Sequence, residues 1–109
     1  MGARPCRLPG EFWDHLRVPD FAAMERYQGR CEAVLIRLSG LVPAPVLDQA
    51  QHLIDHGEPA EGLRSLAWAI KEADLRVPGA EIHEIKALTA ELIRPEHMPP
   101  DFEAHGLPD

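Results

Sequence analysis

Residues 54–66 read IDHGEPAEGLRSL, and this stretch predicts a tight turn that joins two helices. Gly57 suits the end of the first helix, because glycine adopts the left-handed backbone conformation at little cost. Pro59 suits the first position of the second helix, where a backbone N–H would lack a partner in any case. Because the connection is so short, we expect the helices at about 45–56 and 59–74 to be antiparallel neighbours.

Apolar residues that recur every three or four positions predict one further helix on each side of this hairpin. The first helix follows Asp20, a favoured N-cap residue, and ends at Gly40. The last helix spans about 79–93 and follows an extended joint, because the residue before Pro78 avoids the helical conformation. Each helix has an apolar stripe that we expect in the core. In chain order, the stripe of the first helix is Phe21, Met24, Tyr27, Cys31, Val34, Leu35 and Leu38, and that of the second is Val46, Ala50, Leu53 and Ile54. The stripe of the third helix is Leu63, Leu66, Ala67, Ile70 and Ala73, and that of the fourth is Ile82, Ile85, Leu88 and Leu92.

No stretch alternates apolar and polar residues over the length of a strand. The sequence therefore predicts an all-α fold without a sheet, in which the whole chain is one domain and residues 20–93 form a bundle of four main helices. Residues 95–109 contain too much proline for a helix. We expect this tail either to lie across the bundle through Met98, Phe102 and Leu107 or to be loose.

The composition is typical of a folded cytoplasmic protein. Apolar residues make up 45% of the 109 residues and charged residues 27%, and both values are ordinary for a globular domain. No apolar run approaches the roughly 20 residues that cross a bilayer, and the N-terminus has no apolar signal-peptide segment. In a reducing compartment we expect Cys6 and Cys31 to be free thiols. Nine arginines against two lysines, with no asparagine, indicate a GC-rich bacterial genome.

Charge is divided unevenly along the chain. Residues 1–40 carry six basic and five acidic side chains, a net charge of +1, whereas residues 41–109 carry five basic and thirteen acidic side chains, a net charge of −8. Such a surface repels nucleic acids and anionic membranes, and it speeds association with basic proteins. The alternative interpretation is an acidic surface that only keeps the protein solvated.

Trp68 is an unusual residue on the third predicted helix, because it points roughly 140° away from Leu63 in the core stripe. We expect other residues to cover a side chain of this size and to shield it from solvent. We expect the cover to come from the proline-rich arm at residues 1–19, whose short amphipathic segment contains Phe12 and Trp13, or from the C-terminal tail. Alternatively, an exposed Trp68 serves as an anchor in an interface, where tryptophan is enriched.

These arguments give a set of candidate residues for binding a protein partner. All but Trp68 are expected on polar faces or turns of the last three helices, as are the acids Glu81 and Glu91. No lysine or arginine lies between Asp48 and Glu61. A surface this one-sided imitates the phosphate groups that a basic protein binds. The candidates are Asp48, His52, Asp55, Glu58, Glu61, Trp68, Glu72, Asp74 and Glu84.

Metal and catalytic chemistry find little support in the sequence. Asp48, His52, Asp55 and His56 are the best candidates for metal ligands, because helical spacing places at least three of them on one face. A zinc site needs three or four ligands, usually from more than one element, so we expect neither a metal nor another cofactor. There is no glycine-rich phosphate loop, nucleophile elbow or Cys-x-x-Cys motif, and we expect the protein not to be an enzyme.

The hairpin sequence at 54–66 belongs to a longer pattern. Its other parts are Gly40-Leu41, Val77-Pro78 and Ile85-x-x-Leu88. Together these segments describe a helix that ends in Gly-Glu, a second helix that begins with small residues, an extended joint and a final amphipathic helix. Over about residues 40–93, this pattern resembles the MafI-like immunity proteins, which are small helical proteins that accompany polymorphic bacterial toxins.

The resemblance implies a stoichiometric inhibitor that binds and neutralises a cognate toxin from the same locus. The charge of the chain adds that the toxin has a basic surface, and a nuclease is the natural candidate because its cleft must hold phosphates. The alternative function is that of a helical adaptor or small regulatory subunit whose protein partner is not a toxin.

Overall fold

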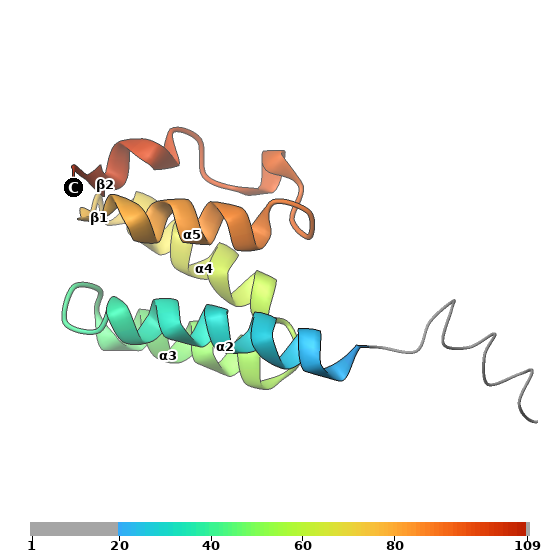
Figure 1. The fold of residues 1–109 in the computed structure, drawn as a ribbon. Helices are drawn as coiled ribbons and strands as arrows, with labels where there is room; N and C mark the ends of the chain where they lie inside the picture. The colour runs from blue at the N-terminus through green and yellow to red at the C-terminus, as the bar shows by residue number, and fades with distance from the viewer. Residues whose placement is uncertain (1–19, 109) are drawn as a thin grey trace, which may run out of the picture.

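The computed structural model describes residues 20–108, which form four α-helices and a folded C-terminal tail (Figure 1). The helices are α2 (Phe21–Arg37), α3 (Ala44–Asp55), α4 (Pro59–Glu72) and α5 (Gly79–Thr89). Their number and order confirm the predicted all-α fold. Within residues 20–108, none of the helices combines the length and the apolar character needed to cross a bilayer.

The helices begin and end for the local reasons that the sequence indicates. The Asp20 side chain accepts a hydrogen bond of 3.0 Å from the backbone N–H of Ala23, which caps α2. Gly40 and Gly57 have φ angles of 90° and 82°, a conformation that favours glycine, and each lies just beyond the end of a helix. Pro59 is the first residue of α4, as predicted.

The core lies between the four helices, and the α3–α4 pair is its most closely packed part. A Cβ atom at Gly62 would lie only 2.7 Å from the carbonyl oxygen of Ala50, so glycine allows the two helices to approach. The largest side chains that the fold buries completely are Val34, Leu38, Ile54, Leu63, Leu66, Ile70, Val77, Ile82 and Ile85.

The first turns of α2 contradict the predicted core. Phe21 is 68% exposed and Met24 is 56% exposed, although both belong to the apolar stripe of this helix. The reason is that α2 extends beyond the helices that it packs against (Figure 1). Burial of the stripe begins at Tyr27, which is half-buried, and becomes complete at Cys31.

The end of α5 also differs from the prediction, because the helix stops at Thr89 and not near residue 93. The hydroxyl of Tyr27 donates a hydrogen bond to the carbonyl oxygen of Leu88 in the last turn of α5. The N–H of Leu92 donates to the Thr89 carbonyl at 3.1 Å and not to Leu88. Leu92, predicted in the core, is therefore 64% exposed, and Ile93 takes the buried position. Ala73, just beyond α4, is exposed as well.

The C-terminal tail lies across the helices, which decides between the two expected arrangements. It contains two 3-10 turns, η1 (Pro95–His97) and η2 (Phe102–His105), and a short strand, β2 (Gly106–Leu107). Phe102 is buried and Met98 packs against the core, whereas Leu107 is exposed. β2 pairs in parallel with β1 (Val77–Pro78), and this two-residue ladder is an addition to the predicted all-helical fold.

Candidate functional site

The structure divides the predicted partner-binding residues among different parts of the fold. Asp48, His52, Asp55, Glu58 and Glu61 lie on the hairpin of α3 and α4. The other four lie on α4 next to the tail, at the end of α4, and on α5; these are Trp68, Glu72, Asp74 and Glu84.

The α3–α4 hairpin presents carboxylates that no basic side chain within residues 20–108 neutralises. Asp48 and Asp55 are seven residues apart, so they lie on one side of α3 at about 10 Å from each other along its axis. His52 lies between them, and Glu58 lies in the following turn; all four side chains are exposed. None of the ion pairs formed within residues 20–108 includes Asp48, Asp55 or Glu58. We call these three residues the acidic hairpin.

A fourth carboxylate adjoins the acidic hairpin from α2. The side-chain amide nitrogen of Gln51 donates to Oδ1 of Asp55 at 2.9 Å and to Oε2 of Glu32 at 3.1 Å. One amide group therefore holds two carboxylates close together, although like charges repel each other. Glu32 was not among the predicted site residues, because its approach to Asp55 depends on the packing of α2 against α3.

Three of the predicted residues are already neutralised within the fold. Glu61 pairs with Arg64 at 2.8 Å, one turn along α4. Asp74 pairs with Arg76 at 2.8 Å, and this hydrogen bond lowers the pKa of the Asp74 carboxyl. The remaining predicted acid at this end of α4, Glu72, is exposed.

The third neutralised residue, Glu84, joins α5 to α2. Both oxygens of its carboxylate accept hydrogen bonds from the Arg30 guanidinium, at 3.0 and 3.1 Å. The hydrogen bond to Glu84 raises the pKa of Arg30. Glu84 was expected to point away from the core into solvent, but this contact turns it towards α2.

Glu81 is the clearest correction to the predicted acidic surface. The sequence places it on a polar face, yet the residue is only 7% exposed. Its Oε2 atom lies 2.6 Å from Nε of Arg37, and the other oxygen, Oε1, is buried without a hydrogen-bond partner within the described part of the chain. Glu81 is therefore part of the contact between α2 and α5 and not part of the exposed acidic surface.

Trp68 receives part of its cover from the C-terminal tail. Its indole N–H donates a hydrogen bond of 2.7 Å to the carbonyl oxygen of His97, and the side chain is half-buried. The tail was one of the two expected sources of cover. Phe12 and Trp13, the other expected source, lie outside the residues that the structure describes.

The metal candidates on α3 come together only in part. The rings of His52 and His56 have centroids 4.1 Å apart, and Nδ1 of His56 lies 2.8 Å from the carbonyl oxygen of His52, to which it donates. Among residues 20–108, no three histidine, cysteine, aspartate or glutamate side chains are arranged to hold a metal ion.

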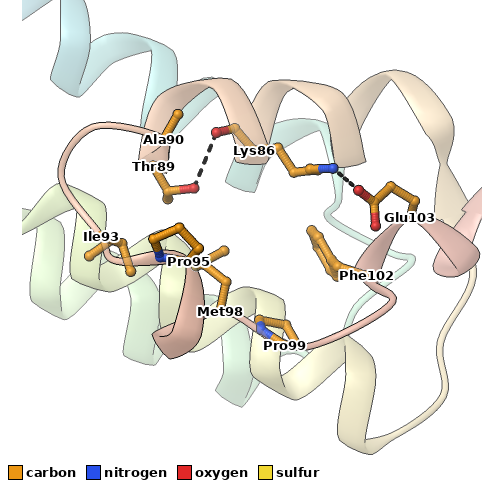
Figure 2. A pocket seen from close by; sticks show the side chains of 9 residues that line it. All are labelled: Lys86, Thr89, Ala90, Ile93, Pro95, Met98, Pro99, Phe102 and Glu103. Carbon is orange, nitrogen blue, oxygen red and sulfur yellow. Dashed lines mark hydrogen bonds and ion pairs between the residues drawn. The ribbon is translucent and has the colours of Figure 1, made fainter.

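A cavity of about 300 Å³ lies between α5 and the tail (Figure 2). The sequence did not predict it. Lys86 and Glu103, its two charged lining residues, form an ion pair with each other, and the Thr89 hydroxyl donates to backbone carbonyls of α5. The two charges therefore compensate each other, and the rest of the lining is mostly apolar. Its other lining residues are Ala90, Ile93, Pro95, Met98, Pro99 and Phe102.

Comparison of the chain with protein-family models, with curated proteins and with solved structures finds no match. Of the features described above, the acidic hairpin combines exposure, uncompensated charge and support from two packed helices. Such a surface suits a basic partner, because exposed charges mainly steer and orient an approaching molecule of opposite charge.

Proposed function

We propose that this protein binds a cognate bacterial toxin and neutralises it as a stoichiometric inhibitor, with the acidic hairpin as its contact surface. The observation that carries the proposal is that Asp48, Asp55 and Glu58 are exposed and belong to none of the ion pairs within residues 20–108. The resemblance of residues 54–66 and their neighbours to MafI-like immunity proteins supports the same function.

The exposed negative charge of the acidic hairpin favours a toxin with a basic cleft. A nuclease has such a cleft, because it must attract and hold the phosphates of its substrate. A carboxylate surface that enters this cleft competes with the nucleic acid for the same positive charges. The hairpin suits this role because the close packing at Gly62 fixes α3 against α4, so little order has to be gained on binding.

The test is the rate of association with the protein encoded next to this gene. Changing Asp48, Asp55 and Glu58 to lysine should slow association by about 10- to 100-fold at low salt, because the charges that steer the partner are reversed. High salt should slow the wild-type protein and reduce the difference between the two proteins. Stopped-flow fluorescence at several salt concentrations measures both effects.

A matched control changes Glu72, Glu96 and Glu103 to lysine. These residues are exposed and lie at the end of α4 and on the two turns of the tail, which contacts Trp68 in α4 and Leu75 just beyond its end. The control has the same net charge as the hairpin variant. Association of the control should remain close to wild type. Equal rates for the two variants would refute the hairpin as the contact surface. A neighbouring protein that does not bind at all, together with capture of a partner that is not a toxin, would favour the adaptor function instead.

A further inference from the structure

The apolar stripe of α2 continues past the end of the core. Cys31 is buried and Tyr27 is half-buried, but Met24 and Phe21, the next positions on the same face, are exposed. Figure 1 shows these first turns of α2 extending beyond the neighbouring helices. We call the exposed part, Phe21 and Met24, the α2 stripe.

We propose that residues 11–17 of this chain dock on the α2 stripe. In a helical conformation, Phe12, Trp13 and Leu16 would lie close together on one side of this segment. They would bring two aromatic rings and an aliphatic side chain to a stripe that contains a phenylalanine and a methionine.

The chain between the two partners has the length and chemistry of a connection between two helices. Residues 18–20 connect them, and antiparallel helices are commonly joined by two to five residues. Asp20 has extended backbone angles, φ −87° and ψ 94°, and its side chain caps α2, so α2 begins directly after it. Pro19 disfavours a helical conformation at Val18, which also interrupts a continuous helix.

Tethering favours this contact. A connection of a few residues keeps the segment at a high effective concentration near the stripe, so a small apolar contact is sufficient. Charge adds no attraction, because residues 11–17 carry one arginine and two acidic residues, a net charge of −1. Trp68, the other surface considered for Trp13, already donates its N–H to the tail.

Trp13 provides a direct measurement, since Trp13 and Trp68 are the two tryptophans of the chain. In the full chain with Trp68→Phe, Trp13 is the remaining tryptophan. Its emission should be blue-shifted and protected from acrylamide. Adding Phe21→Gln and Met24→Gln should move the emission to that of exposed tryptophan and remove the protection.

Trypsin cleavage after Arg17 gives a second measurement that leaves Trp68 unchanged. Docking protects this bond, so Phe21→Gln with Met24→Gln should accelerate its cleavage by about tenfold or more. The matched control is Ile36→Gln with Leu41→Gln, because both residues are large, apolar and exposed but lie at the other end of α2. The control should change neither the emission nor the cleavage rate.

Three results would overturn the proposal. The first is a Trp13 emission that is already that of exposed tryptophan before the stripe is changed. The second is an equal effect of the stripe variant and the control. The third is protection that disappears on dilution, which would mean that the stripe binds a second copy of the chain and not its own residues 11–17.

Discussion

Replacing Gly62 with alanine should destabilise the protein, although alanine is the better helix former. Gly62 lies inside α4 where this helix approaches α3. The added Cβ atom would lie 2.7 Å from the carbonyl oxygen of Ala50 and 3.3 Å from Cγ1 of Ile54. The first contact involves backbone, so α3 itself must move away by several tenths of an ångström, and the two helices that carry the acidic hairpin would separate.

Two effects of opposite sign determine the magnitude. Overpacking a closely packed site costs about 1–3 kcal/mol. Exchanging glycine for alanine inside a helix stabilises it by about 0.5–1 kcal/mol. The net result should be a free energy of unfolding lower by about 1–2 kcal/mol, and a domain of this size would then lose roughly 5–10 °C in Tm.

The assay is urea unfolding followed by circular dichroism, with Gly29→Ala as the matched control. Gly29 lies inside α2, and a Cβ atom there would meet nothing within 4 Å. The control should therefore raise the free energy of unfolding by about 0.5–1 kcal/mol through helix propensity and the lower entropy of the unfolded chain. If Gly62→Ala were as stable as Gly29→Ala, with the same denaturant dependence, the close contact of α3 and α4 would not limit the hairpin and the reasoning would be wrong.

Two further predictions concern groups between α2 and α5. Arg37→Ala should lower the free energy of unfolding by about 2 kcal/mol, because it leaves the buried Glu81 carboxylate without its partner. Arg64→Ala, on the exposed side of α4, should change this free energy by less than about 0.5 kcal/mol. Thermal or urea unfolding measures both effects. Burial raises the pKa of the Cys31 thiol from 9.0 to about 11, so the unfolded chain loses this proton at lower pH than the folded chain. The free energy of unfolding should therefore fall by about 2 kcal/mol as pH rises from 9 to 11. The decrease should be smaller in Cys31→Ala. Equal effects of the two arginine variants, or identical pH profiles for the parent and Cys31→Ala, would contradict these assignments.

The four helices could be predicted from the sequence because their signals are local. A cap at Asp20, the glycines that end two helices and Pro59 at the start of α4 act within a few residues of their own positions. The end of α5 could not be predicted, because no glycine or proline marks it between Thr89 and Pro95, and the last turn contacts distant residues such as Tyr27, 61 residues away from Leu88 in the chain. Helical periodicity likewise shows which face of α2 is apolar but not where its partners end, and Phe21 was therefore placed in the core.

The candidate site follows the same division between local and distant information. Exposure of Asp48, Asp55 and Glu58 follows from their positions on α3 and its turn, and the structure agrees. The proximity of Glu32 to Asp55 could not be inferred from the sequence, because it depends on how α2 packs against α3. The burial of Glu81 could not be inferred either, because its partner, Arg37, is 44 residues away in the chain.

Ion pairs within the fold neutralise part of the charge asymmetry along the chain. Residues 1–40 are slightly basic and the rest strongly acidic, but Arg30 and Arg37 of α2 neutralise carboxylates of α5. Part of the asymmetry therefore serves the contact between these two helices and exerts little force on a distant partner. Charge that can steer a partner must lie where no arginine reaches it. Within residues 20–108 the α3–α4 turn meets this condition, since Asp55 and Glu58 border it and neither forms an ion pair. The functional test therefore belongs at the acidic hairpin and not on α5, although the sequence alone gives both regions the same sign of charge.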